Sequence, residues 1–268
     1  MYVAFVDVLG FASAVSALSA DDEAALMDVL ARGQDGSDDR EILPGRASAA
    51  NLYYNYSAFQ HLVREQIHWL TTSMPNKRVT PSNLRTALFS DSVYLASDDV
   101  IVLAAVIRIM IGAICWNIPI RSGIAKGNFI AFEWSTRVAR LTDVHFGAPF
   151  LGSGVVRAYF AESKGAHGLR AIVHPSAAAD LAAQHPDTLI PLLDSEMNEF
   201  GTHELVFDSS LWWPDVAVSY VSGFPLRESL PGRLEWLKGY APPHTWPAYE
   251  ATIRAVERMR DARRRKQK

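Results

Sequence analysis

The sequence is poor in cysteine, in long apolar runs and in net charge, and each shortage excludes a class of protein. Cys115 is the single cysteine among 268 residues, so no internal disulfide can form and a reducing compartment is expected. The most apolar stretch, residues 100–116, is broken by Arg108 and is shorter than the roughly 20 residues of a membrane span. The net charge of -3 gives no general attraction to nucleic acid or anionic lipid. We therefore expect a cytoplasmic protein without membrane or nucleic-acid partners.

Apolar patterning predicts a β-α-α-β-β-α-β-α-β order with a helix at the C-terminal end. The carboxylates of Asp98 and Asp99 are expected to cap the helix that follows them. The predicted strands cover residues 2–9, 84–90, 92–96, 118–130 and 169–174, and the predicted helices cover 12–30, 48–72, about 100–116, 154–163 and 246–265. This order indicates an α+β fold with an antiparallel or mixed sheet and helices on one face, as in a ferredoxin-like palm.

The same pattern suggests one catalytic core with additions at its C-terminal side. The core is expected over residues 1–174, residues 175–245 are expected to complete the same domain, and residues 246–268 form a helix with a basic tail. The tail is expected to be either a solvated helix end or a contact for phosphate-bearing ligands.

Two aspartates occupy positions where an unpaired carboxylate is unfavourable. Asp7 lies near the end of the apolar strand Phe5-Val6-Asp7-Val8, and Asp91 lies at the tip of the predicted hairpin. If the two strands are neighbours, both carboxylates reach the same sheet edge, where they could hold two hard cations such as Mg²⁺. The alternative is that both cap turns or pair with core arginines.

The residues after Asp7 suit an anionic ligand. Gly10 allows the backbone to approach a charged group closely, and amides at a helix start can surround phosphate. Leu9, Gly10 and Phe11 are therefore the expected binding residues for a phosphate-bearing ligand.

Four segments together resemble the class III adenylate and guanylate cyclases over roughly residues 2–174. They are Phe5-Val6-Asp7-Val8-Leu9-Gly10-Phe11, Ser90-Asp91-Ser92, Arg121-Ser122-Gly123-Ile124-Ala125-Lys126-Gly127, and residues 152–163, which read GSGVVRAYFAES. The resemblance implies that Asp7, Val8 and Asp91 hold two Mg²⁺ or Mn²⁺ ions. It also implies a homodimer whose active sites combine the metal-binding residues of one subunit with the late helix of the other.

The sequence departs from this family at the positions that read a purine and stabilise the transition state. Ala87 stands where adenylate cyclases carry a base-reading Lys, and Pro149 stands at the second base-reading position. Val156 and Phe160 replace the Asn and Arg of the late helix. The domain is thus either a divergent cyclase with another base, in which Arg157 supplies positive charge, or a catalytically inactive domain that binds a nucleotide or a partner for regulation.

The run Arg157-Ala158-Tyr159-Phe160-Ala161-Glu162 resembles the pyrimidine cyclases of bacterial Pycsar antiphage systems. That resemblance implies synthesis of cyclic UMP or cyclic CMP, which activates a partner effector. UTP is favoured over CTP as the substrate. Tyr54, between Tyr53 and Tyr56, is a candidate to fill the space that a smaller base leaves.

Overall fold

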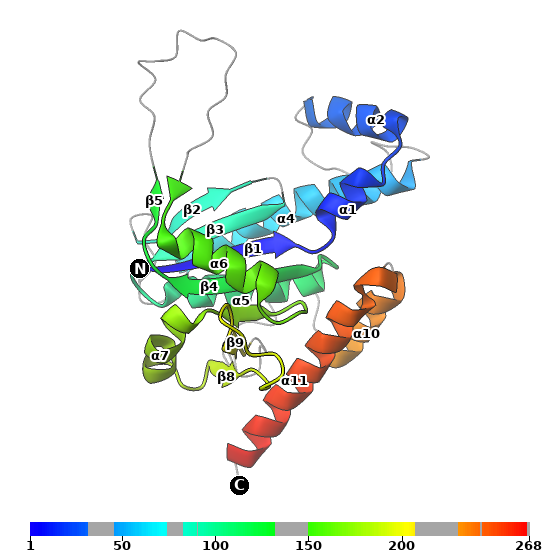
Figure 1. Cartoon of the computed structure of the whole chain (residues 1–268). Helices are drawn as coiled ribbons and strands as arrows, with labels where there is room; N and C mark the ends of the chain where they lie inside the picture. The colour runs from blue at the N-terminus through cyan, green and yellow to red at the C-terminus, as the bar shows by residue number, and fades with distance from the viewer. Residues whose placement is uncertain are drawn as a thin grey trace, which may run out of the picture.

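The protein was analysed as a computed structural model that describes residues 1–31, 46–73, 83–89, 91–131, 150–206, 230–241 and 243–266. Figure 1 shows a central sheet with helices packed against it and a long C-terminal helix at one side. Pro149, one of the expected positions near the base, lies outside the described residues. In the described part of the chain, no helix combines the length and apolar composition needed to cross a membrane.

The sheet has the mixed but mainly antiparallel character that was predicted. Within the described residues it contains seven strands in the order β2-β3-β1-β4-β7-β9-β8, and β4 pairs with β7 in parallel while the other pairs are antiparallel. The strands are β1 (Tyr2–Val8), β2 (Arg85–Leu88), β3 (Ser92–Ser97), β4 (Ile120–Lys126), β7 (Ala171–Val173), β8 (Leu189–Pro191) and β9 (His203–Leu205). The short strands β5 (Ile130–Ala131) and β6 (Phe150–Leu151) form a separate pair.

The α+β architecture is confirmed, and helices cover both faces of the sheet rather than one. Alternate β1 residues such as Ala4 and Val6 face the main core, to which α4 (Ala47–Ser73), α5 (Ile101–Cys115), α10 (Leu230–Tyr240) and α11 (Trp246–Lys266) contribute. Val3 and Phe5 face the opposite side, where α6 (Ser153–Lys164) packs. Figure 1 shows α6 crossing the sheet on the face away from α4 and α5. Side chains alternate along a strand, so a strand of apolar residues needs cover on both sides.

The N-terminal helical region consists of two helices, not the single helix predicted over 12–30. Helix α1 covers Phe11–Ser16 and helix α2 covers Ala20–Ala31. The break follows from capping: the Ser19 hydroxyl accepts a hydrogen bond from the Asp22 amide at 3.1 Å and donates one to the Asp22 carboxylate at 2.8 Å. This arrangement begins a new helix at Ala20.

Two further predictions about element ends are corrected. Asp98 and Asp99 do not cap α5, because its N-cap is Val100 and the helix has no capping hydrogen bond from a side chain. The strand predicted over 118–130 stops at Lys126. The predicted hairpin of β2 and β3 is confirmed, and α4, α6 and α11 agree closely with the helices predicted over 48–72, 154–163 and 246–265. Helix α7 (Pro175–Gln184) and the 3-10 turn η2 (Pro243–Thr245) complete the described elements.

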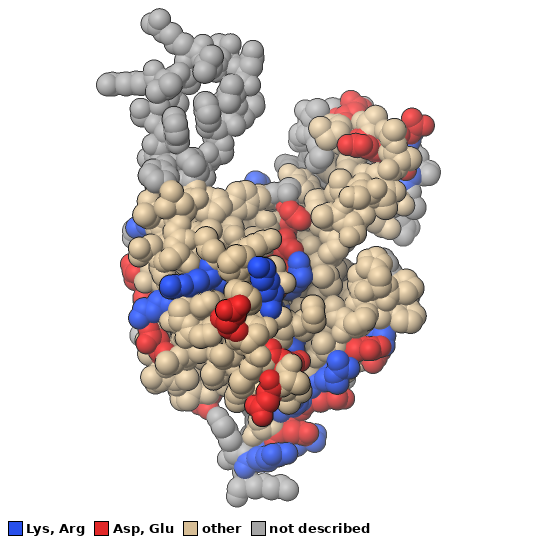
Figure 2. Space-filling model, viewed as in Figure 1, with Lys and Arg blue, Asp and Glu red and all other residues tan. Residues whose placement is uncertain are grey.

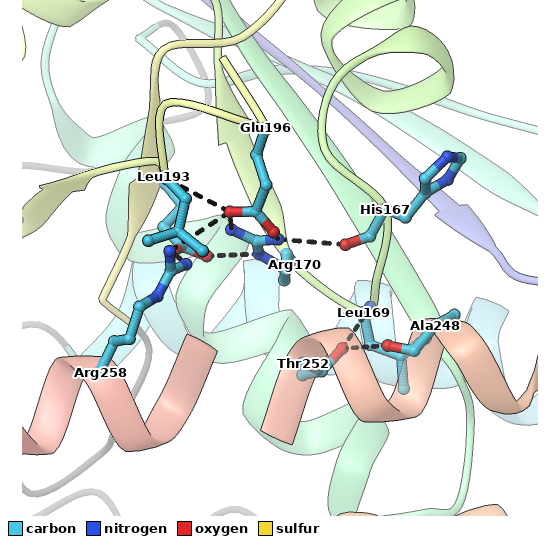
Figure 3. A network of polar contacts seen from close by, with 9 residues as sticks. His167, Leu169, Arg170, Leu193, Glu196, Ala248, Thr252 and Arg258 are labelled. Carbon is cyan, nitrogen blue, oxygen red and sulfur yellow. Dashed lines mark hydrogen bonds and ion pairs between the residues drawn. The ribbon is translucent and has the colours of Figure 1, made fainter. Parts of the chain in front are cut away.

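A buried network of charges joins α11 to the far half of the sheet (Figure 3). Arg170, just before β7, donates to Glu204 of β9 at 2.5 Å and to Glu196 at 2.8 Å. Arg258 of α11 donates to the same two carboxylates, at 2.6 Å to Glu204 and 3.3 Å to Glu196. The Arg170 and Glu204 side chains are both 0% exposed. Two guanidinium groups therefore neutralise two carboxylates in a network whose Arg258 and Glu196 side chains are partly exposed.

This network assigns part of the basic C-terminal segment to the interior. Arg258 belongs to the charged run that the sequence leaves open to a phosphate contact, and its guanidinium is held by Glu196 and Glu204 instead. Residues 267–268 lie outside the described part of the chain.

We expect Glu204→Gln to lower the free energy of unfolding by about 3 kcal/mol, because it leaves the buried Arg170 and the partly exposed Arg258 with one carboxylate. Urea titration monitored by circular dichroism measures the change. The control is Glu235→Gln on α10, an exposed carboxylate 3.9 Å from Lys238, which should change the stability by less than about 0.5 kcal/mol. Equal losses in the two variants would contradict the structural role of the network.

Candidate functional site

The candidate site lies at the carboxyl end of β1. Asp7 is opposite Ser92 of β3 and Arg121 of β4, and it is the one residue of β1 that is not fully buried. The Val8 amide donates to the Asp91 carbonyl at 3.0 Å. Since β1 and β3 are neighbours, the condition set by the sequence is met, and Asp7 and Asp91 meet at one edge of the sheet. At the place where β1 ends, Figure 2 shows acidic side chains lying against a basic one at the surface.

The environment of Asp7 disfavours its negative charge. The pKa of Asp7 is raised to about 6, chiefly by burial; Arg121 lowers it and the nearby Asp91 carboxylate adds a smaller increase within this value. The Asp7 side chain is 18% exposed, so it keeps access to water and to a ligand. An additional positive charge at this edge would favour the ionised carboxylate.

Arg121 and Glu162 belong to this site, although the sequence did not mark them as site residues. An Arg121 Nη2 atom lies 3.5 Å from the Asp7 carboxylate, and the Arg121 Nε atom contacts the Glu162 carboxylate. The Glu162 side chain is 1% exposed. Burial raises the pKa of Glu162 to about 7, the Asp7 charge adds to this effect, and Arg121 opposes it.

The contact between Arg121 and Glu162 depends on how closely α6 lies on β4. Gly123 faces the helix, and a Cβ atom there would collide with the Ala158 carbonyl oxygen and the Glu162 amide nitrogen. With hydrogen in place of a side chain, the helix backbone rests directly on the strand. Glu162 therefore reaches the strand residue that neighbours Asp7. Both residues stand in segments noted in the sequence, but their separation along the chain gives no sign of contact.

Among the residues expected to bind an anionic group, Leu9 uses its amide within the protein, where it donates to the Pro119 carbonyl at 2.7 Å. Gly10 has a φ of 81° and is the N-cap of α1, and Phe11 begins that helix. The side chain of Val8 is apolar and buried in the core, so a metal ligand from Val8 would have to be its carbonyl oxygen.

Tyr54 is held near the end of α5, and Arg157 lies apart from the two aspartates. The Tyr54 hydroxyl donates to the Trp116 carbonyl at 3.3 Å, after the end of α5. Arg157 donates to the Lys126 carbonyl at 3.0 Å. Lys126 pairs with Tyr2 whereas Arg121 pairs with Asp7, so Arg157 is at the other end of β1, about 16 Å along the strand. One chain alone does not bring Arg157 to Asp7.

The residues at the sheet edge suit a hard cation shared with a ligand. In the described part of the chain, Arg121 lies between the carboxylates of Asp7 and Glu162, with Asp91 near Asp7, and carboxylate oxygens are donors of the kind that Mg²⁺ and Mn²⁺ prefer. Among the described residues, no three His, Cys, Asp or Glu side chains are gathered as a metal site. A cation at Asp7 and Asp91 would therefore take its other ligands from water or from a phosphate-bearing substrate, as Mg²⁺ commonly does.

The sequence matches no protein-family model and no curated protein.

The raised pKa of Asp7 predicts a specific pH dependence of stability in cation-free buffer. The folded state holds a proton on Asp7 up to about pH 6, whereas the ordinary pKa is 3.8, so this stabilisation is present at low pH and is lost as the pH rises through 6. The parent should lose this stabilisation between pH 5 and pH 8 and Asp7→Asn should not, so the unfolding free energy of the variant relative to the parent should rise by about 1 kcal/mol. Urea unfolding at both pH values measures this difference.

Asp22→Asn is the control for this experiment. The Ser19 hydroxyl, followed by Arg46, lowers the pKa of Asp22, so its charge does not change between pH 5 and pH 8. The difference between that variant and the parent should be the same at both pH values. If the difference in unfolding free energy between Asp7→Asn and the parent were also the same at both pH values, Asp7 would not titrate in this range.

Proposed function

We propose that the chain is a class III-type nucleotidyl cyclase that converts a pyrimidine nucleoside triphosphate, UTP in preference to CTP, into its 3′,5′-cyclic monophosphate and pyrophosphate. The observation that carries the proposal is the meeting of Asp7 and Asp91 at one sheet edge, beside Arg121. The resemblance to class III cyclases assigns metal binding to these two aspartates. Its four segments fall on β1, the β2–β3 hairpin, β4 and α6, and these elements adjoin one another.

The reaction requires that the substrate be folded onto itself and that its charge be neutralised. The ribose 3′-oxygen forms a bond to the α-phosphorus, the bond from that phosphorus to the bridging oxygen breaks, the hydroxyl proton passes to water and pyrophosphate leaves. Divalent cations, two per site in this proposal, supply positive charge for the oxygens that gain negative charge. The protein would hold those cations through Asp7, Asp91 and the Val8 carbonyl. The amides of Gly10 and Phe11 would bind the pyrophosphate.

The proposal includes a homodimer that brings Arg157 to the site of a second copy. Within one chain Arg157 is at the wrong end of β1, as its bond to the Lys126 carbonyl indicates. The same helix leaves Val156 51% and Tyr159 45% exposed. Apolar side chains on the helix that carries Arg157 favour α6 as the surface between subunits. Arg157 would then add positive charge to the transition state in the partner's site.

The base and the biological setting rest on the Pycsar resemblance. Ala87 on β2 cannot supply the hydrogen bond with which adenylate cyclases read adenine. Tyr54 is partly exposed near the end of α5 and remains the candidate for the space beside a smaller base. The product would act as a second messenger in antiphage defence by activating a partner effector.

The second candidate is a catalytically silent cyclase-like domain that binds a nucleotide or a partner for regulation. Val156 and Phe160 favour it, because neither can replace the Asn and Arg expected on the late helix. Phe160 packs instead against Phe200 at a ring distance of 5.4 Å, with the Lys164 ammonium 4.4 Å above its ring.

The first experiment incubates the purified chain separately with ATP, GTP, CTP and UTP in the presence of Mn²⁺ and detects cyclic products by mass. We expect cyclic UMP as the main product, with a loss of about 10²–10³-fold in Asp7→Asn or Asp91→Asn. The control is Asp180→Asn, which removes a carboxylate paired with Lys126 at the other end of β4. Undiminished turnover in a folded Asp7→Asn variant would end the assignment, and silence with all four substrates would favour the regulatory domain.

A second experiment tests the subunit interface. Placing a charge in an apolar interface is costly, so Val156→Glu should weaken self-association by about 30-fold or more and reduce product formation in parallel. Light scattering over a range of protein concentrations measures the association. Met27→Glu, at a 60% exposed position on α2, is the control. A dimer that withstands Val156→Glu would place the interface elsewhere.

A further inference from the structure

Arg121 stands between two carboxylates that are held by different elements. Asp7 is fixed by the ladder of β1, which pairs with both β3 and β4. Glu162 is fixed by α6, which Gly123 allows to rest on β4. The Arg121 side chain is 32% exposed, more than either carboxylate. The guanidinium is therefore the member of the three with the most freedom to move.

The two contacts of Arg121 are unequal. Its Nη2 atom donates a hydrogen bond to the Asp7 carboxylate at 3.5 Å, at the outer limit for such a bond. Its Nε atom forms an ion pair with the Glu162 carboxylate, although neither Nε nor Glu162 Oε1 makes a hydrogen bond among the described residues. A guanidinium facing a single carboxylate commonly forms two parallel hydrogen bonds. Here the guanidinium is shared between two carboxylates, so it does not form that two-bond pair with Asp7.

We infer that Arg121 is the resident counter-ion of Asp7, and that Glu162 is a positioning residue that holds the guanidinium when a divalent cation binds to Asp7. This inference rests on the proposed metal site. Two cations beside one carboxylate repel each other, so a cation arriving at Asp7 favours a position in which Arg121 gives up its contact with Asp7 and keeps its contact with Glu162. The total charge of the three side chains stays the same in both positions.

The role of Glu162 follows from what its removal would allow. Without that carboxylate, Arg121 has one remaining acidic partner and closes onto Asp7 as a full pair, which competes with the metal ion. Glu162→Gln should therefore weaken cation binding by about tenfold, although Glu162 itself is not a ligand. Arg121→Gln combined with Glu162→Gln removes the competitor as well, so the double variant should bind at least as tightly as the parent.

The test measures Mn²⁺ affinity directly, from the electron paramagnetic resonance signal of free Mn²⁺ titrated with the full chain in the absence of nucleotide. The series comprises the parent, Glu162→Gln, the double variant and Asp7→Asn, each checked for folding by circular dichroism. Asp180→Asn is the matched control, because Asp180 pairs with Lys126, which lies on β4 like Arg121 but at the other end of that strand. That variant should bind Mn²⁺ like the parent.

Recovery of Mn²⁺ affinity in the double variant separates this role from a structural one. If the substitutions acted by damaging the fold, two of them would lower the affinity more than one. Parental affinity in Glu162→Gln, a further loss in the double variant, or no Mn²⁺ binding by the parent would each overturn the inference.

Failure of the proposed function has a different signature. A parent that binds Mn²⁺ with this order of affinities but forms no cyclic nucleotide would refute the cyclase assignment and leave the role of Glu162 standing. If the parent makes cyclic nucleotide and Glu162→Gln binds Mn²⁺ as the parent does, the cyclase assignment stands and the role of Glu162 is refuted.

Discussion

The close contact between α6 and β4 is the constraint on which the candidate site depends. Gly123 has no side chain, so the helix backbone rests on the strand, and a Cβ atom there would strike both Ala158 and Glu162. This contact covers the second face of the sheet and buries Val3 and Phe5 of β1. It also places a carboxylate from the helix beside the arginine that neighbours Asp7. The contact of α6 with β4 at Gly123 therefore determines both the packing on this face and the charges next to Asp7.

The molecule handles buried charge in two contrasting ways. Around Arg170 and Glu204, two guanidinium groups face two carboxylates, and the network joins α11 to the sheet. At the end of β1, one guanidinium is shared between Asp7 and Glu162, and burial raises the pKa of both carboxyls. Removing one member of a buried network is costly, whereas carboxyls with raised pKa values beside the surface are typical of functional sites.

Much of the fold could be predicted because its signals are local. A continuous run of apolar, β-forming residues defined β1, and a tight turn between two apolar runs defined the hairpin that carries Asp91. The break between α1 and α2 was equally local, since Ser19 and Asp22 form a capping pair that can be found in the sequence. The helices on both faces were not predicted, because the cover of each face depends on segments distant in the chain.

By itself the sequence determined the α+β class, the two aspartates and the strand positions that carry them. A carboxylate inside an apolar strand is conspicuous because its burial without a partner is costly. Only the tertiary structure decided which residues surround Asp7. It added Arg121 and Glu162, committed the Leu9 amide to Pro119 and placed Arg157 at the opposite end of β1. These relations arise from pairing register and from helix-on-sheet contact, and neither is encoded by residues adjacent in the chain.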